Sequence, residues 1–370
     1  MAGGELVGEE ERRLLERAGL RLLWFDSMGA KSSSLFLEDG VLIDPGAAAM
    51  QPSYPLSGDL KEELRRRAVR LIELYAGAAE AIVITHYHHD HYTSPLDPAL
   101  GRPGSIYRGA RLLVAKNPNR FINHSQWVRA RRFFEELAGV LGGSVEEAEC
   151  REACIGDPVE ELVESNSRDW GGYAGRRAEL LAKGRRWFEK LVEVWSRGPC
   201  LAERFRLGGL QVVLDDGFCF TVRSTTVCLM GPFFHGVEYD RTGWVTPVLV
   251  EARGVRVLYT SDLMGPIIDD YAYWVAGLKP DILVADGPPT YLYPYMLNRV
   301  NLRRAVEAMR IILLESSGLK LVVYDHHVMR DPRWRARVAP VLEEAERVGV
   351  PVVPASLVRL SAPPLIDVVG

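Results

Sequence analysis

The stretch that decides the fold is Ile84-Thr85-His86-Tyr87-His88-His89-Asp90-His91, which holds four of the eight histidines of this 370-residue chain. It follows directly on Ala81 to Ile84, a short apolar run typical of a buried strand. Imidazole and carboxylate groups in the pattern His-x-His-x-Asp-His suit zinc or iron, and a loop leaving a strand end can direct several of them at one point. By composition arithmetic, chance yields this pattern in fewer than roughly one such chain in a thousand. We therefore interpret it as a metal-binding motif rather than a polar turn.

One loop cannot supply a two-metal centre, and the other candidate ligands also follow apolar β-type runs. They are His235 after the run ending at Met230, Asp262 after Val255 to Tyr259, and His326 and His327 after Lys320 to Tyr324. The carboxyl ends of strands are where such folds display ligands. His124 is the exception, because it lies in a helical pattern between Arg120 and Arg129, and we interpret it as a surface histidine.

Many short β-type runs with helices at intervals predict two sheets covered by helices on their outer faces. Strands are expected at 21–25, 34–38, 41–43, 81–84, 211–214, 219–222, 226–230, 246–251, 255–259, 281–285 and 319–324. Asp39-Gly40 predicts a hairpin between two of them. Helices are expected at 61–75, 298–314 and 333–347.

Residues 118–198 differ from both flanks, since they hold almost no β pattern and carry two apolar helical stripes. We predict a single α/β domain over 1–370, with a core from 1–117 and 199–370 and a helical insertion at 118–198. Charge is segregated there: a basic run without Asp or Glu precedes an acidic stretch from Glu135 to Asp169. The run comprises Arg102, Arg108, Arg111, Lys116, Arg120, Arg129, Arg131 and Arg132. Two solvated helix faces that attract each other are favoured over a groove for an anionic substrate.

The composition narrows the classes of protein. A total of 45 Lys and Arg against 49 Asp and Glu argues against a protein that coats nucleic acid. We expect a soluble cytoplasmic protein, because the chain has neither a signal-peptide pattern nor the ~20 apolar residues of a membrane span. Five cysteines, an odd number in a long chain, predict buried or free thiols rather than a disulfide framework. Association into a homo-oligomer stays open.

The motifs resemble those of the metallo-β-lactamase superfamily, whose members are αββα sandwiches with binuclear metal centres. The matching positions occur in the family's order: Asp44 in Val41-Leu42-Ile43-Asp44-Pro45-Gly46, the run from His86 to His91, His235, Asp262 and a final histidine near 326. The segments THYHHDHY, TSDLMGP, DGPPTYL and DHHVMRD are more specifically similar to a group of archaeal members. That closer match gives no substrate.

Residue by residue, the resemblance implies two divalent metal ions, with Zn favoured and Mn or Fe as alternatives. It assigns His86, His88 and His235 to one ion, Asp90, His91 and His326 to the second, Asp262 to both, and Asp44 to orienting the histidine loop. His327 is the alternative to His326. The chain departs from the family where Tyr92-Thr93-Ser94-Pro95 replaces a Gly-rich continuation.

The implied function is a metal-dependent hydrolase in which a hydroxide held by both metals attacks the substrate, with Asp90 and Asp262 as catalytic residues. The basic run favours a phosphodiester or other phosphate-bearing substrate, either a small molecule or a nucleic acid. The alternatives are an ester, thioester or lactone hydrolase acting on a small metabolite, an iron-dependent redox protein, and a binding module without activity. His88 stands where diiron redox members have glutamate. Tyr291, Tyr293 and Tyr295 lie in a loop that either walls a substrate pocket or packs on itself.

Overall fold

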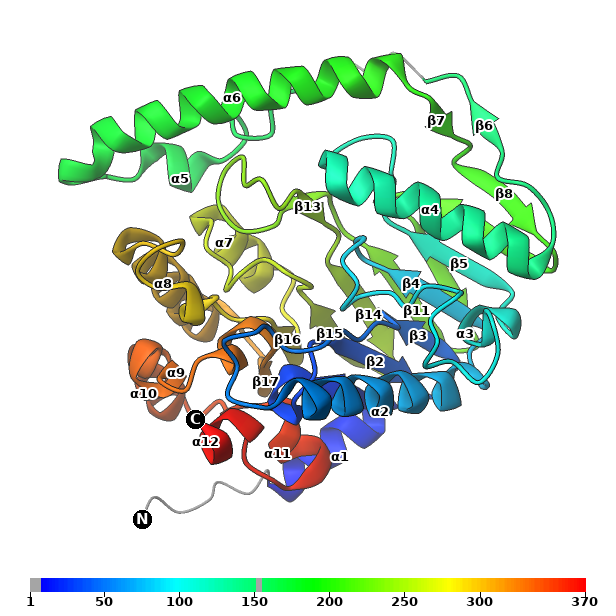
Figure 1. Cartoon of the computed structure of the whole chain (residues 1–370). Coiled ribbons are helices and arrows are strands. Elements are labelled where there is room, and N and C mark those ends of the chain that lie inside the picture. Colours follow the sequence, from blue (N-terminus) through cyan, green and yellow to red (C-terminus); the bar gives the residue numbers. More distant parts are fainter. Residues whose placement is uncertain (1–7, 151–154) are drawn as a thin grey trace.

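The computed structural model describes residues 8–150 and 155–370, and two seven-stranded sheets form their centre (Figure 1). The first sheet has the order β1-β2-β3-β4-β5-β9-β8, with β1 (Leu20–Phe25), β2 (Ser33–Leu37), β3 (Val41–Ile43), β4 (Ala81–Ile84), β5 (Leu112–Ala115), β8 (Arg204–Leu207) and β9 (Leu210–Leu214). The second has the order β10-β11-β14-β15-β16-β17-β18, with β10 (Cys219–Val222), β11 (Thr225–Leu229), β14 (Val248–Ala252), β15 (Val255–Tyr259), β16 (Ile282–Ala285), β17 (Leu321–Tyr324) and β18 (Val352–Val353). Two short ribbons pair β6 (Glu147–Ala148) with β7 (Cys200–Leu201) and β12 (Phe233–Phe234) with β13 (Trp244–Val245).

Alternate side chains of the central strands are buried on opposite faces, and this produces four layers. In β4, Ala81 and Val83 pack in the cluster between the sheets, whereas Ile82 and Ile84 pack outward under helices. The outer helices over the first sheet include α2 (Gly58–Ala76), α3 (Ser105–Arg108), α4 (His124–Leu141) and α6 (Ala174–Arg197). Those over the second include α7 (Asp269–Gly277), α8 (Arg299–Glu315) and α10 (Ala339–Val348). The expected αββα sandwich is confirmed.

The remaining helices lie at the edges and in the middle segment. They are α1 (Glu9–Ala18), α5 (Val163–Ser167), α9 (Trp334–Arg337), α11 (Ala355–Leu360) and α12 (Leu365–Val369), with the 3-10 turns η1 (Asp26–Met28), η2 (Gly171–Tyr173), η3 (Thr290–Leu292) and η4 (His326–Arg330). The helix expected at 333–347 is two helices, because Pro340 starts a new one at the first turn of α10. In the described part of 118–198, α4, α5 and α6 dominate, and α6 crosses the top of the molecule in Figure 1.

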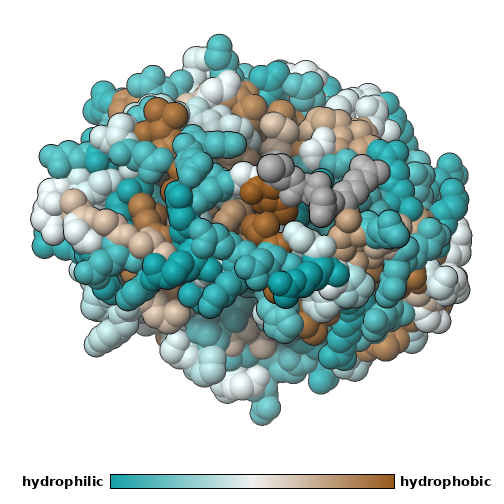
Figure 2. Space-filling model, turned by 90° about the horizontal axis from the view of Figure 1, so that it is seen from above, coloured by the Kyte–Doolittle hydropathy of each residue, from teal (hydrophilic) through white to brown (hydrophobic). Residues whose placement is uncertain are grey.

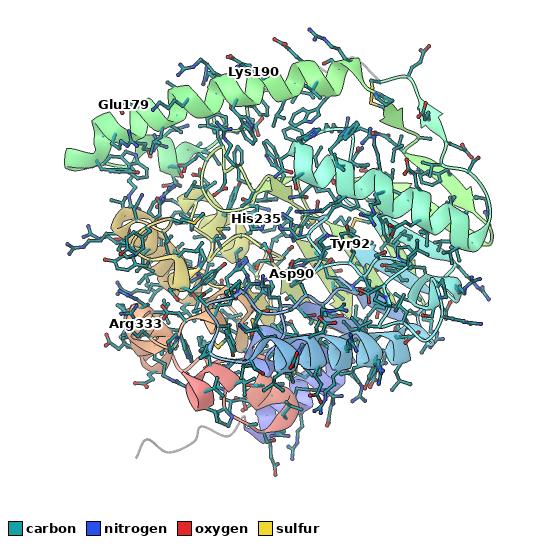
Figure 3. All side chains as sticks on the ribbon, in the orientation of Figure 1. Asp90, Tyr92, Glu179, Lys190, His235 and Arg333 are labelled. Atoms are coloured by element: carbon teal, nitrogen blue, oxygen red, sulfur yellow. A yellow bond between two sulfur atoms is a disulfide. The ribbon has the colours of Figure 1, made fainter. Side chains whose placement is uncertain are left out.

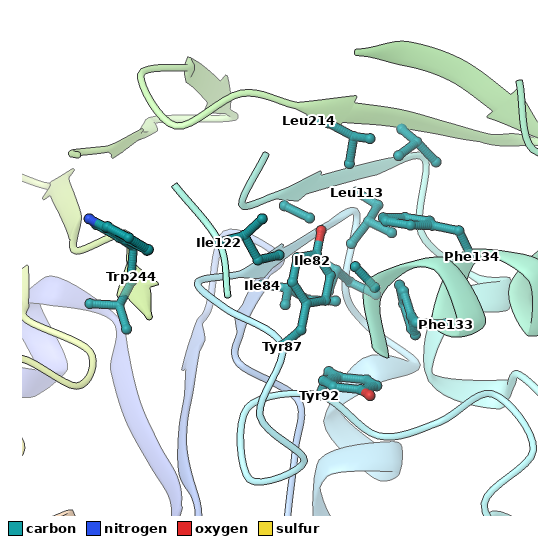
Figure 4. Close-up of a cluster of buried hydrophobic side chains, with 14 of the residues drawn as sticks. Ile82, Ile84, Tyr87, Tyr92, Leu113, Ile122, Phe133, Phe134, Leu214 and Trp244 are labelled. Atoms are coloured by element: carbon teal, nitrogen blue, oxygen red, sulfur yellow. The ribbon is translucent and has the colours of Figure 1, made fainter. Parts of the chain in front are cut away.

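An aromatic cluster joins the histidine loop to the outer layer (Figure 4). Tyr87, within the loop, and Tyr92, which directly follows it, are buried against Phe133 and Phe134 of α4. The Tyr92 and Phe133 ring centroids are 5.2 Å apart in an edge arrangement, which aromatic rings favour. The position of the loop therefore depends on α4.

Figure 2 looks down on the face that carries α6, where hydrophilic residues predominate and hydrophobic ones form separate patches. Among the described helices, none combines the length and the apolar character needed to cross a membrane.

The cysteine prediction is wrong, because four of the five cysteines form disulfides. Cys219 and Cys228 face each other across the β10–β11 hairpin, with Cα atoms 4.1 Å apart. Cys150 and Cys200 join the β6–β7 ribbon, with Cα atoms 5.2 Å apart. Both separations lie in or close to the range that disulfides span. Cys154 lies outside the described residues.

Asp39, in the β2–β3 hairpin, connects the two sheets. Its carboxylate accepts hydrogen bonds from the Ser224 hydroxyl at 2.7 Å and the Thr225 hydroxyl at 2.9 Å, both in the β10–β11 hairpin. Arg253 lies 3.3 Å from its other oxygen. The hydrogen bonds from Ser224 and Thr225, against the effect of burial, lower the pKa of Asp39 to about 2. Because these donors favour the charged form, the ionised carboxylate stabilises the fold.

Asp39→Asn should lower the free energy of unfolding by about 1 to 2 kcal/mol at pH 7. The pKa is depressed in the folded state, so the stabilisation is complete above the unfolded value near 4 and is lost as pH falls toward about 2. Urea denaturation at several pH values should show wild type and variant converging in acid. Glu189→Gln, which removes an exposed carboxylate in the interior of α6, is the control and should change stability little. A difference independent of pH would contradict this account.

Candidate metal centre

The predicted ligands gather where the ends of strands from both sheets meet. Asp44 and His86 follow β3 and β4 of the first sheet, and Asp262 and His326 follow β15 and β17 of the second. Figure 3 shows Asp90 and His235 near the middle of the molecule, below α6. The backbone turns sharply at three of these strand ends, with φ of 47° at Asp44, 52° at Ser261 and 68° at His326. Such conformations cost about 1 to 3 kcal/mol each, so the surrounding contacts must hold them.

The first group comprises His86, His88, His235 and Asp262, whose donor atoms all lie within 4.8 Å of one another. His86 Nε2 is 3.1 Å from His88 Nδ1 and 3.5 Å from Asp262 Oδ2. His235 Nε2 is 3.2 Å from the same carboxylate oxygen. Three imidazoles and one carboxylate are a donor set that suits a divalent transition metal.

The second group comprises Asp90, His91 and His326, again within 4.8 Å. It faces the other oxygen of Asp262: His91 Nε2 is 3.2 Å and His326 Nε2 is 3.5 Å from Oδ1. Asp90 Oδ2 is 3.7 Å from His326 Nε2. The two oxygens of Asp262 therefore point at different groups of donors, and Asp262 stands between them.

The structure brings both His326 and His327 to the centre. His327 Nε2 lies 3.6 Å from Asp262 Oδ2, the oxygen that His86 and His235 also face. Its Nδ1 donates to Asp286 at 2.9 Å. His326 and His327 thus face different oxygens of Asp262, but their donor atoms and that carboxylate also lie within 4.8 Å of one another, so both histidines are candidate ligands.

Three buried carboxylates each orient one histidine through its Nδ1. Asp44 accepts from His91 at 2.8 Å, Asp26 accepts from His326 at 2.8 Å, and Asp286 accepts from His327. Such contacts fix the ring and its tautomer and raise the basicity of the opposite nitrogen. The sequence analysis included Asp44 but missed Asp26 and Asp286. Both follow strands, so the strand-end rule applied to Asp could have found them.

Asp44 is held by several further contacts. Its carboxylate accepts from the Thr85 backbone N–H at 2.8 Å, the Thr85 hydroxyl at 2.7 Å and the Tyr259 hydroxyl at 2.8 Å. Nearby, Gly46 allows the 44–46 turn to approach the histidine loop, because a Cβ there would lie 2.2 Å from the Tyr92 nitrogen. The turn and the loop therefore form one rigid unit.

Electrostatics divide the histidines into two kinds. Burial lowers the pKa of His88 to about 3 and that of His86 well below its usual range. Burial also opposes charge on His91 and His326, but Asp262 and Asp44 raise the pKa of His91 well above its usual range. Asp26 and Asp262 raise that of His326 to about 10. Without a metal, His91 and His326 carry the positive charge that balances Asp262.

The buried atoms fit metal ions. His91 Nε2 and Asp262 Oδ1 are buried and have no hydrogen-bond partner among the described residues, although they are only 3.2 Å apart. An unpaired buried polar atom is costly. A cation between the nitrogens and the carboxylate oxygens would satisfy these atoms at once, so the His and Asp groups are suited to divalent metal binding.

The N-terminus of α4 supports the first group. Gln126 accepts from the Tyr87 backbone N–H at 3.2 Å and donates to the Thr242 carbonyl at 2.7 Å. Its amide nitrogen lies 3.4 Å from His88 Nε2, which leaves His88 Nδ1 facing the centre. Asn123 donates to the carbonyls of Arg241 and Thr242. This helix end thus ties the histidine loop to the 235–243 loop that carries His235.

Further contacts from α6 and α8 hold the 235–243 loop. Buried Glu238 accepts from Arg304 of α8 at 2.9 Å and from Arg177 of α6 at 3.2 Å. Gly184 of α6 lies so close to Tyr239 that a Cβ would be 2.4 Å from its ring. Sequence reasoning missed this anchoring, since it joins residues far apart in the chain.

Several other predicted residues lie away from the donors. Tyr87 is buried and its hydroxyl donates to the Lys116 carbonyl at 2.7 Å, whereas His89 is exposed and packs beside Tyr92. His124 is exposed at the start of α4, as expected. Tyr291 lies 3.4 Å from the Arg330 guanidinium at the centre, but Tyr295 is 94% exposed. Of the tyrosine loop, only Tyr291 approaches the centre.

The basic run does not form one open groove, because internal partners take up much of its charge. Buried Lys116 pairs with Asp216 at 2.9 Å, Arg120 with Glu203 at 3.6 Å and Arg132 with Glu136 at 2.7 Å. Arg129 donates to the Tyr87 carbonyl and Arg131 to the Pro199 carbonyl. These contacts weaken the argument for an anionic substrate that rested on this run.

The stacked sheets, the outer helices and the strand-end donors define a protein of the metallo-β-lactamase fold. In sequence the chain is similar to archaeal proteins named UPF0282. The protein of that name from Korarchaeum cryptofilum is 29% identical over 332 residues, which cover 89% of this chain and 85% of that protein. The one from Methanopyrus kandleri is 26% identical over 336 residues, covering 88% and 90%. No protein-family model matches the chain.

Solved structures similar to this chain include the metallo-β-lactamase fold protein YhfI from Bacillus subtilis and unliganded yeast PDE1. The first has a TM-score of 0.38 at 12% identity, covering 88% of this chain and 92% of YhfI. The second has a TM-score of 0.43 at 11% identity, covering 91% and 97%. The archaeal relatives and the sandwich topology confirm the resemblance that the motifs indicated.

Asp44→Asn should weaken metal affinity about 10- to 100-fold, because His91 loses the anion that fixes its ring. Competition with a chromogenic chelator measures the affinity directly. The same exchange at Asp39, far from the centre, is the matched control and should leave metal affinity unchanged. Equal affinities for the Asp44 variant and wild type would show that Asp44 does not orient a ligand.

Proposed function

We propose that the protein is a metal-dependent hydrolase with two divalent ions. One ion takes His86, His88 and His235, the second takes Asp90, His91 and His326, and Asp262 contacts both. The observation that carries this proposal is the Asp262 carboxylate, whose two oxygens face two separate groups of histidines. Zn suits the imidazole-rich donor set, with Mn or Fe as alternatives.

Ions bound by these donors would supply Lewis-acid polarisation of a substrate oxygen and lower the pKa of a coordinated water. The chain's own residues supply orientation. Asp90 is partly exposed at the centre and is fixed by Arg330 at 3.3 Å, so its free edge can orient an attacking water. Burial lowers the pKa of His327 well below its usual range, which keeps the ring neutral, so its Nε2 can accept a hydrogen bond from a water at the centre. Asp286 holds that ring in place.

We favour a phosphodiester or another phosphate-bearing substrate. An ester, thioester or lactone hydrolase on a small metabolite is the second candidate, because the same donors serve acyl transfer. A redox role for iron is less well supported, since His88 places an imidazole nitrogen among the donors where a redox site would use glutamate.

Purified wild type should hold close to two ions per chain, measured by elemental analysis, and His88→Ala should hold fewer. The loss follows because His88 Nδ1 is one of the few donors of the first group. His124→Ala removes an exposed histidine and should leave the metal content unchanged. A metal-free wild type that is as stable as the loaded form would refute the proposed centre.

His326→Ala and His327→Ala should behave differently, although the residues are neighbours. His326→Ala should lose metal, whereas His327→Ala should keep most of it and lose at least about 100-fold in turnover. Turnover is measured on a panel of chromogenic phosphodiesters, phosphomonoesters, esters and thioesters, with metal content determined for each sample. If His327→Ala loses as much metal as His326→Ala, His327 is a ligand and our assignment is wrong.

A further inference from the structure

Lys31 stands in the loop between η1 and β2 that lines the second group of donors. Hydrogen bonds connect the residues before and after it in the chain to His326 of the centre. Asp26 accepts from His326, the Ser32 backbone N–H donates to Asp26 at 2.9 Å, and the Ser32 carbonyl lies 3.1 Å from His326 Nδ1. Lys31 itself pairs with Ala48 through two backbone hydrogen bonds of 2.9 Å. The backbone of Lys31 is therefore held rigidly beside the centre.

The Lys31 side chain is half-buried, and among the described residues its ammonium has no hydrogen bond or ion pair. Burial and the nearby Arg330 lower the pKa of Lys31, while Asp90 and Asp26 raise it. The ammonium is therefore within electrostatic reach of both carboxylates and of Arg330, and it makes no direct contact with any of the three. Arg330, in contrast, is fully engaged by Asp26, Asp90 and Tyr291. Lys31 is thus a cation at the centre whose donors are still available.

The surroundings favour an anion as the partner of these donors. The charges of Asp26 and Arg330 largely cancel, since the two side chains form a direct ion pair. A loaded centre would then be positive, because Asp90, Asp262 and Asp44 do not balance two divalent ions, and Lys31 adds to that charge.

We propose that Lys31 binds a phosphate oxygen of the substrate and makes the centre selective for phosphate-bearing substrates. The proposal rests on the proposed function and specifies its substrate class. A lysine ammonium is a compact point charge that suits phosphate oxygens, and charge-assisted hydrogen bonds are about twice as strong as neutral ones. Unlike Lys116, Arg120 and Arg132 of the basic run, this cation forms no ion pair with a carboxylate among the described residues.

The first test measures binding of inorganic phosphate to the metal-loaded protein by calorimetry. Lys31→Ala should bind phosphate about tenfold more weakly than wild type, and Lys31→Arg should stay within about threefold, because it keeps the charge. Lys190→Ala, which removes an exposed lysine of α6 (Figure 3), is the matched control and should bind as wild type does. Metal content and thermal unfolding are measured for every variant. Equal phosphate affinity of Lys31→Ala and wild type, or no binding by loaded wild type, would overturn the proposal.

The second test separates substrate classes by kinetics. Lys31→Ala should raise KM about tenfold for bis(4-nitrophenyl) phosphate and leave KM for 4-nitrophenyl acetate unchanged. A short single-stranded oligonucleotide serves as a competitor: inhibition that depends on Lys31 assigns the phosphate to a nucleic acid, and its absence assigns it to a small molecule. An equal effect on both chromogenic substrates would overturn the role of Lys31. Absence of metal from wild type would instead refute the proposed function.

Discussion

The carboxylate of Asp262 is the contact around which the rest of the structure is arranged. Its oxygens lie 3.2 to 3.6 Å from the nitrogens of five histidines, which come from both sheets and from the β12–β13 ribbon. A single residue can occupy that position only if strand ends of the two sheets meet and the backbone turns abruptly after β15. Burial of apolar side chains holds the two sheets together, and the positive φ at Ser261 turns the chain so that Asp262 reaches this position. The packing of the two sheets therefore determines the geometry of the centre as well as the fold.

Much of the fold followed from local pattern, because continuous apolar runs such as the one containing Ile82 and Val83 identify strands buried on both faces. The apolar pattern failed to predict elements in which the spacing of apolar residues was irregular or shared with charged residues. The strand β8 alternates charged with apolar residues at a sheet edge, and the predicted helix at 333–347 is interrupted at Pro340. The prediction of free thiols relied on the odd number of cysteines and on the expected cytoplasmic compartment. Cys219 and Cys228, however, occupy paired positions of one hairpin. The compartment rule also has known exceptions among hyperthermophilic archaea.

For the centre, sequence located the residues at strand ends but not their relations. Nothing in the order of His326 and His327 reveals that they face opposite oxygens of Asp262, because that depends on the left-handed backbone at His326. Asp26 lies 300 positions from His326 in the chain, and their contact is visible only in three dimensions. The role of Gln126 could not be predicted for the same reason, since it requires α4 to begin beside the histidine loop.

The attachment of the middle segment restricts how this architecture can be altered. Asn123 and Gln126 hold the 235–243 loop from one side, while Arg177 and Gly184 hold it from another. The segment thus supports the loop that carries His235, a proposed metal ligand, through direct contacts. Its outer face carries exposed residues such as Glu179 and Lys190 (Figure 3), so substitutions and engineered fusions should be tolerated there. Excision of the segment, by contrast, would free the loop on which His235 is mounted, while His86 and Asp262 would still follow strands of the two sheets.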